Sequence, residues 1–431
     1  MVAYDYDGAL KVGPLTVDAA SLVGVYIAVK PLYLWHSGIP QIADLLLVVA
    51  TVLLAKRIWQ SAIWAKNTIR STVLLFVGLC LFQGVVNVAW SVVLHANLWK
   101  STLFYAFNCM AFVDVLVVAE CGVERLKQAM LQGAIVSLAV VIIGLLFDMS
   151  HDHFYAQKTG ETLYLRSTSF FNHPNQLGFH CLIILMLVLW CSEGVKHRAV
   201  IIVPVTVVTL LAIVASASRA AFVGALVMVA AYGSFVAVRI HGLSLWKVAA
   251  CVVIISSLSC ILLFVDIPFV VTHPAIASAR ERITKVTFAS ILSFDKSRTY
   301  GRIFEVGPHT LWGMGEGATS RFATRTQYEV HSTLLALYVS YGLIGAVGYV
   351  LLIGRCACWL GLIRLLKSPE TTAAIDQVVM RMMTKYYALR NLALLSGVLL
   401  YQVAHNGIRN TIIWMVLAVF LCECQYSDIN R

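Results

Sequence analysis

The stretch that decides the fold runs from Ala199 to Val238 and reads AVIIVPVTVVTLLAIVASASRAAFVGALVMVAAYGSFVAV. It contains two apolar runs, 199–216 and 220–238, and Arg219 between them is its one charged residue. A helix needs about 20 apolar residues to cross the hydrocarbon core of a bilayer. The stretch therefore predicts two antiparallel transmembrane helices joined by a tight turn.

The rest of the chain has the same character. Of its 431 residues, 60% are hydrophobic and only 12% are charged, whereas about a quarter of the residues of an ordinary soluble domain are charged. This composition argues against a soluble globule, a disordered chain and a nucleic-acid-binding protein, despite a formal net charge of +11. The sequence predicts a polytopic membrane protein.

Apolar stretches bounded by charged residues, Pro or Gly mark the expected spans. There are twelve such stretches: 14–36, 40–55, 71–94, 102–119, 129–148, 174–192, 199–216, 220–238, 245–265, 332–354, 388–404 and 410–424. We find no tandem repeat. We therefore expect an all-α fold, a membrane helix bundle of about twelve transmembrane helices that forms a single domain over residues 1–431.

The distribution of Lys and Arg predicts the orientation. The loops on the side of the termini carry sixteen of these residues, and the short loops on the other side carry five. Because cytoplasmic loops are enriched in Lys and Arg, we expect both termini in the cytoplasm. The long loop 266–331, between spans nine and ten, is then external, and its stretch 276–294 is expected to form an amphipathic surface helix. The loop 355–387 is then cytoplasmic, with an interfacial helix that runs into span eleven.

The eleven cysteines mostly fall inside apolar runs, and the close pairs Cys356/Cys358 and Cys422/Cys424 lie at predicted cytoplasmic ends. Disulfides are rare in the cytoplasm. The pattern therefore argues against a disulfide framework and favours cysteines that pack as small buried hydrophobes.

Charge is sparse on the predicted external side, so the residues found there are informative. The Arg219 side chain is expected at the level of the external membrane surface. It could extend towards lipid phosphates, or it could bind a phosphate inside the bundle with its planar guanidinium. Both interpretations are open from the residues alone.

Two further elements lie at predicted external helix ends. Pro174 can occupy the first turn of span six, with His173 and Asn175 beside a helix N-terminus that favours an anion; an ordinary cap is the alternative. His331 lies at the mouth of span ten, where it could transfer a proton or hydrogen-bond a phosphate, or act as an interface anchor. The glycines Gly342 and Gly345 permit close helix packing.

Taken in order, these elements form a larger pattern: Arg-x₃-Phe-x₂-His-Pro-Asn from Arg166, Ser-Arg between two spans, a long external loop with Gly-Arg and Gly-x-Gly, and His-Ser-x₉-Gly-x₂-Gly from His331. Between Arg166 and Gly345 this order resembles the superfamily of O-antigen ligases and of O-antigen and exopolysaccharide polymerases.

The resemblance implies a metal-independent membrane glycosyltransferase with no cofactor, which acts at the periplasmic face of the bacterial inner membrane. It implies a donor, an undecaprenyl diphosphate-linked oligosaccharide, and a glycan or lipid A-core as acceptor. A chain-length regulator and a flippase are further expected partners. By resemblance, Arg219, Arg302 and His331 are catalytic, and Arg166, His173 and Asn175 bind substrate.

The sequence departs from the family in two places. The spacing from Arg302 to Gly313 is short, and His405, Asn406 and Arg409 stand where related ligases carry an acidic residue between spans eleven and twelve. We lean towards a polymerase, with a ligase as the alternative. A lipid-linked oligosaccharide flippase is the competing class, but a transporter should show midplane charges and broken helices in matched halves.

The remaining polar residues support simpler interpretations. We find no external Asp-x-Asp motif and no His or carboxylate cluster with metal-ligand spacing. Lys30 and Asp44 are expected to form a structural ion pair, and Asp114 to hydrogen-bond inside the bundle. Glu305 and Glu316 are alternative candidates for the base, although most loop glutamates are solvated.

Overall fold

The computed structural model describes residues 2–4, 9–12, 15–35, 40–95, 97–151, 153–159, 162–241, 306–307, 309–316, 332–358, 375–405, 407 and 410–426. Its helices are α1 (Ala19–Val29), α2 (Ile42–Gln60), α3 (Asn67–Leu94), α4 (Thr102–Ala119), α5 (Val123–Ser150), α6 (Pro174–Cys191), α7 (Ala199–Ala215), α8 (Arg219–His241), α14 (Thr333–Cys356), α16 (Ile375–Ala404) and α17 (Thr411–Tyr426). Two short 3₁₀ segments, Ala62–Ala65 and Leu98–Ser101, precede α3 and α4.

The fold is a mostly helical bundle with the character of a multi-pass membrane protein. Eleven of the twelve predicted spans coincide with a helix, and the ninth, 245–265, lies outside the described residues. Within the described residues, six helices are long and apolar enough to cross a membrane: α3, α4, α5, α6, α14 and the Arg219–Val238 part of α8. The total of twelve spans stays a prediction.

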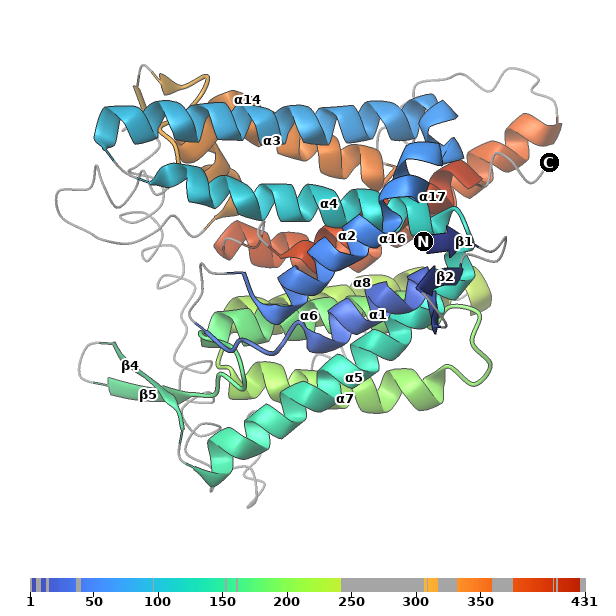
Figure 1. Ribbon diagram of the computed structural model, residues 1–431. Helices are drawn as coiled ribbons and strands as arrows, with labels where there is room; N and C mark the ends of the chain where they lie inside the picture. Colours follow the sequence, from blue (N-terminus) through green and yellow to red (C-terminus); the bar gives the residue numbers. More distant parts are fainter. Residues whose placement is uncertain are drawn as a thin grey trace.

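The helices run side by side, and α6 lies at the centre of the bundle (Figure 1). It packs against α5, α7, α8 and α16, and almost all of its side chains are buried. By contrast, α3 and α5 expose large apolar side chains such as Val85, Val92 and Ile143. Apolar residues on the outside as well as in the core are expected of a bundle that lies in lipid.

The all-α prediction missed two small antiparallel sheets. The strands β1 (Val2–Tyr4), β2 (Ala9–Val12) and β3 (Leu15–Asp18) form the first sheet, and β4 (Tyr155–Thr159) and β5 (Thr162–Arg166) form a hairpin with Tyr155 opposite Arg166. Strands of three to five residues are too short for a hydropathy analysis, which searches for runs of about 20 residues.

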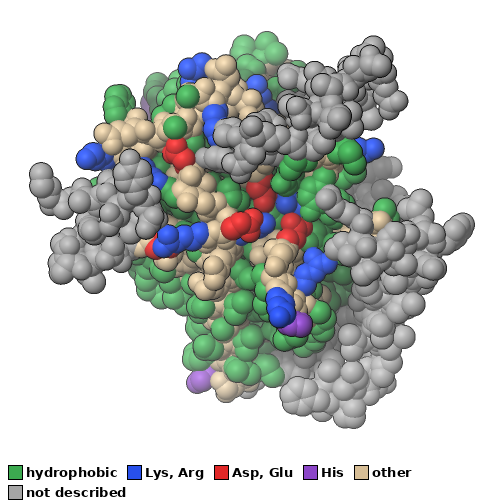
Figure 2. Space-filling view, turned by 90° about the vertical axis from the view of Figure 1, so that its right-hand side faces the viewer, with side chains coloured by type: hydrophobic (Ala, Val, Ile, Leu, Met, Phe, Trp, Pro, Cys, Tyr) green, Lys and Arg blue, Asp and Glu red, His purple; other side chains and the backbone are tan. Residues whose placement is uncertain are grey.

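Both termini lie at the end of the bundle opposite the β4–β5 hairpin (Figure 1). Figure 2 looks onto the end with the termini, where acidic and basic side chains gather among apolar ones. Arg390 pairs with Glu193 at 3.2 Å and with Glu423, and Lys127 lies 3.3 Å from Glu423. These buried ion pairs join α5, the end of α6, α16 and α17. That this end faces the cytoplasm stays a prediction.

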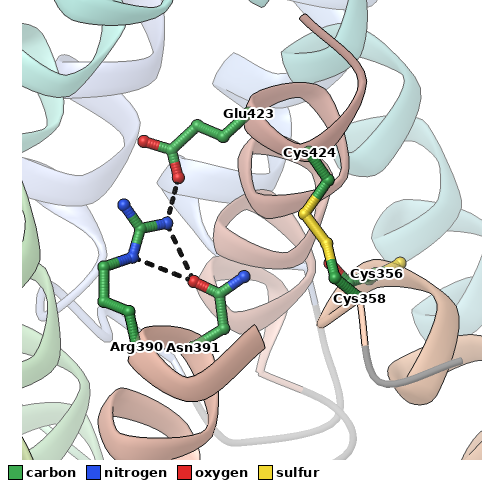
Figure 3. Close-up of a disulfide and its surroundings, with 6 residues drawn as sticks. All are labelled: Cys356, Cys358, Arg390, Asn391, Glu423 and Cys424. Carbon is green, nitrogen blue, oxygen red and sulfur yellow. Dashed lines mark hydrogen bonds and ion pairs between the residues drawn. A yellow bond between two sulfur atoms is a disulfide. The ribbon is translucent and has the colours of Figure 1, made fainter. Parts of the chain in front are cut away.

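A disulfide at this end contradicts the prediction drawn from the cysteines. Cys358, just after α14, is bonded to Cys424 in α17 (Figure 3). The two residues are 66 positions apart in the sequence, and they meet because α14 and α17 pack together. Cys181, Cys191, Cys356 and Cys422 are free and buried, as predicted.

Part of the long loop inserts into the bundle and does not stay outside it. Gly342 breaks α14 with φ 64° and ψ −161°, and the described residues 309–316 pair with the backbone around the break. The N–H of Met314 donates to Val339 O at 2.9 Å, and that of Leu343 donates to Thr310 O at 2.8 Å. Gly342 thus serves a helix break and not only close packing. The predicted surface helix 276–294 lies outside the described residues.

Several smaller predictions can be compared with the structure directly. Lys30 Nζ lies 2.7 Å from Asp44 Oδ1, which confirms the predicted ion pair. Asp114 is buried and accepts a hydrogen bond from Thr51 Oγ1 at 2.6 Å, as expected. The predicted interfacial helix and span eleven form one continuous helix from Ile375 onwards; its position relative to a membrane stays a prediction.

Candidate functional site

Arg166 is the central residue of the candidate site. It ends β5, and only 1% of its surface is exposed. Its Nε donates to the carbonyl of Ser216 at 2.9 Å, and its Nη2 donates to Asn175 Oδ1 at 2.7 Å. These two hydrogen bonds fix the orientation of the guanidinium. The arginine joins the start of α6 to the turn between α7 and α8.

The start of α6 follows the sequence prediction. Pro174 occupies the first turn, and His173 is the N-cap, with its Nδ1 accepting from the N–H of Asn175 at 3.1 Å. Pro is favourable there because its missing N–H is not needed in the first helical turn. The ring of His173 also meets that of Tyr155 edge-on, with centroids 5.1 Å apart, so the cap also contacts the β4–β5 hairpin.

Arg219 is the first residue of α8 and is half-buried. The turn that precedes it, Ser216–Ser218, packs directly on α6. A Cβ added at Gly178 would lie 2.7 Å from Ser218 Cβ and 2.9 Å from Ser216 Oγ, so glycine is needed for this approach. Through this turn the structure brings Arg166, His173 and Asn175 to the segment that begins at Arg219.

The same end of the bundle includes the start of α14 and the end of α16. Tyr401 donates its hydroxyl to the carbonyl of Asn175 at 3.1 Å. Thr333 Oγ1 donates to the carbonyl of His405 at 3.1 Å, which connects the first turn of α14 to this group. Thr333 follows His331 by two residues. His331, Arg302, Asn406 and Arg409 lie outside the described residues.

Glu316, an alternative candidate for the base, is not solvated. It is 9% exposed, accepts from Tyr341 at 2.7 Å and from Tyr105 at 3.4 Å, and its N–H donates to Asn87 at 2.8 Å. Tyr341 lies eight residues beyond Thr333 in α14, about 12 Å along a helix axis. Glu316 therefore belongs to a second polar cluster, deeper in the bundle. Glu305 lies outside the described residues.

Sequence reasoning did not identify Asp148 and Tyr401, which hold the Arg166 segment. Asp148 accepts the N–H groups of Thr168 and Ser169 at 3.0 and 2.7 Å. A carboxylate in the last turn of an otherwise apolar predicted helix was the available signal. Tyr401 gave a weaker signal, as the one aromatic residue of the predicted span eleven, 388–404.

The arrangement is suited to an anion. A buried guanidinium, a helix N-terminus and a side-chain amide meet here, and each of these groups favours negative charge or donates hydrogen bonds. Within the described residues, no group of three or more His, Cys, Asp or Glu side chains could hold a metal ion.

Comparison with known proteins gave no match, either to a protein family or to a curated protein.

Proposed function

We propose that the protein is a membrane glycosyltransferase that moves a glycan from an undecaprenyl diphosphate donor to a glycan acceptor. We further propose that it works at the periplasmic face of a bacterial inner membrane and polymerises exopolysaccharide or O-antigen repeat units. The observation that carries the proposal is the buried Arg166 guanidinium, which bonds both Asn175 and the turn before Arg219. The order of motifs along the chain supports the same function.

In the proposed reaction an acceptor hydroxyl attacks the anomeric carbon of the donor sugar. The bond from that carbon to the diphosphate oxygen breaks, the hydroxyl proton passes to a base, and undecaprenyl diphosphate leaves. Negative charge builds on the oxygen of the leaving group. Guanidinium groups held in place before the reaction stabilise such charge at little reorganisation cost.

The roles of individual residues follow from this chemistry. Arg219 and Arg302 hold the diphosphate. Arg166 assists them, and its hydrogen bond to Asn175 keeps the start of α6 in place. His173 caps the N-terminus of α6. His331 accepts the hydroxyl proton or bonds a phosphate oxygen.

Reconstitution tests the proposal. The purified protein in liposomes should convert a defined undecaprenyl diphosphate oligosaccharide into longer glycans, resolved on a gel. Arg219→Ala, Arg166→Ala and His331→Ala should each lower the rate by about a hundredfold or more, the loss seen when a charge-stabilising donor is removed. Arg70→Ala is the matched control, because Arg70 is exposed and its side chain donates a hydrogen bond to the exposed Asn67. Normal product from a well-folded Arg219→Ala protein would end this assignment.

The same assay separates the acceptors, because added lipid A-core should become glycosylated only by a ligase. The break in α14 at Gly342 favours a second candidate of another class, a lipid-linked oligosaccharide transporter, since transporters use broken helices. Movement of labelled donor across the liposome membrane, with no glycan product, would support the transporter instead.

A further inference from the structure

Asp148 lies in the last turn of α5, and only 1% of its surface is exposed. Its Oδ2 accepts hydrogen bonds from the N–H groups of Thr168, at 3.0 Å, and Ser169, at 2.7 Å. These amides lie two and three residues after Arg166. Asp148 therefore holds the turn that connects the site arginine to α6.

The same aspartate also contacts the chain before the β4–β5 hairpin. Its Oδ1 lies 3.6 Å from Nδ1 of His153, and its carbonyl accepts the N–H of His153 at 3.0 Å. The hairpin that ends at Arg166 thus begins and ends on one residue of α5. Joining both ends of this segment limits the positions that Arg166 can take.

The turn has little room to move. Ser169 has φ 51° and donates its hydroxyl to the carbonyl of Val141 at 3.0 Å. A Cβ added at Gly144, one turn before Asp148, would lie 2.1 Å from Ser169 Oγ. The turn is seated on α5 by the shape of Gly144 and by the acceptor oxygen of Asp148.

From this geometry we propose that Asp148 is a positioning residue for Arg166. By fixing residues 168 and 169, it places the guanidinium where it reaches Ser216 and Asn175 at once. An arginine has several rotatable bonds, so a fixed backbone reduces the ordering that ligand binding would otherwise require. The effect on ligand binding rests on the proposed function; the effect on the turn does not.

Binding of undecaprenyl diphosphate to the full-length protein in nanodiscs tests the effect of Asp148 on ligand binding. We expect Asp148→Ala to raise Kd about tenfold or more, as small misplacements in a site do. Gly144→Ala should act in the same direction, because it displaces the same turn. Asp148→Asn keeps an oxygen that can accept both amides and should stay near the wild-type Kd. Ser150→Ala, an exposed position on the same helix, is the control.

A double-mutant cycle separates positioning from general destabilisation. In an Arg166→Ala background, Asp148→Ala should change Kd by less than about twofold, because its effect passes through Arg166. A full additional loss in that background would overturn the proposal. If Asp148→Ala is not recovered from membranes, wild-type Kd in Gly144→Ala would overturn it equally.

Hydrogen exchange of the protein without undecaprenyl diphosphate tests the effect of Asp148 on the turn at residues 168 and 169. Asp148→Ala should speed exchange at the amides of Thr168 and Ser169, whereas Arg166→Ala should leave both protected. Unchanged exchange in Asp148→Ala would overturn the positioning role. Faster exchange in a protein that binds no undecaprenyl diphosphate would instead leave Asp148 in this role and reject the proposed function.

Discussion

At the scale of single residues, two buried ionisable groups, Arg166 and Glu316, have different hydrogen-bond partners. Arg166 donates to Ser216 O and to Asn175 Oδ1, and these two bonds orient its guanidinium. Glu316 instead accepts from two tyrosine hydroxyls, which satisfy it locally. Burying a polar or charged group is costly unless it is hydrogen-bonded. We therefore infer that the two tyrosines stabilise the buried Glu316, and that Glu316 attaches the loop segment 309–316 to the bundle.

Replacing Tyr341 with Phe removes the shorter of the two tyrosine hydrogen bonds to Glu316, at 2.7 Å. Because the acceptor is a buried carboxyl group, we expect a loss of about 1.5–3 kcal/mol in the free energy of unfolding. Chemical unfolding in detergent micelles, followed by circular dichroism, measures it.

Tyr349→Phe is the matched control, since Tyr349 donates to the neutral Gln402 at 2.8 Å. Its loss should be smaller, about 1 kcal/mol. A Tyr341→Phe protein that is no less stable than Tyr349→Phe would contradict the anchoring role of Glu316.

At the scale of elements, the sequence predicts helices well and their interruptions poorly. Runs of about 20 apolar residues locate α3, α4 and α6, because hydropathy depends only on local composition. Pro174 marks the start of α6 for an equally local reason. The break at Gly342 depends on residues 309–316, which precede it by more than 25 positions. The disulfide between Cys358 and Cys424 likewise depends on the packing of α14 against α17.

The candidate site divides in the same way. The sequence identifies Arg219 as a candidate because it stands between two apolar runs, and His173 and Asn175 because they flank the helix start at Pro174. Arg166 enters through the family resemblance. It does not predict that Arg166 bonds the carbonyl of Ser216, since a backbone acceptor leaves no mark in the sequence. The contributions of Asp148 and Tyr401 are hidden for the same reason, as both act on backbone groups of distant segments.

Gly342→Ala tests the break in α14. The φ of 64° with ψ of −161° at this position is costly for any residue with a side chain, and an added Cβ would lie 2.3 Å from the backbone of Leu311. We expect a loss of more than about 2 kcal/mol in the free energy of unfolding, measured by chemical unfolding in micelles. Gly78→Ala in α3 is the control: nothing lies within 4 Å of its added Cβ, and Ala is the better helix former. Equal stability of the two variants would argue against a glycine-dependent break.

At the scale of the whole molecule, the two ends of the bundle differ in chemistry. One end holds the buried ion pairs of Arg390, Lys127, Glu193 and Glu423 and the disulfide. The other holds Arg166 and the start of α6, where Arg166 donates to Ser216 O and Asn175 Oδ1. Paired charges at one end contribute to the packing of α5, α16 and α17, and breaking such a pair is strongly destabilising. The proposed site lies at the end opposite these ion pairs.

The orientation of the bundle can be tested on α5, whose 28 residues span about 42 Å at 1.5 Å per residue, more than the roughly 30 Å of a hydrocarbon core. The exposed Cys121 precedes this helix, and the exposed Ser150 ends it. If the site faces the periplasm, a membrane-impermeant maleimide should label an S150C variant, made in a Cys121→Ser background, in intact spheroplasts. Cys121 of the wild-type chain should react only after permeabilisation. The opposite pattern would place Arg166 at the cytosolic face, where the proposed donor diphosphate would have to be reached from inside the cell. Labelling of both positions in intact spheroplasts would mean that α5 does not cross the membrane at all.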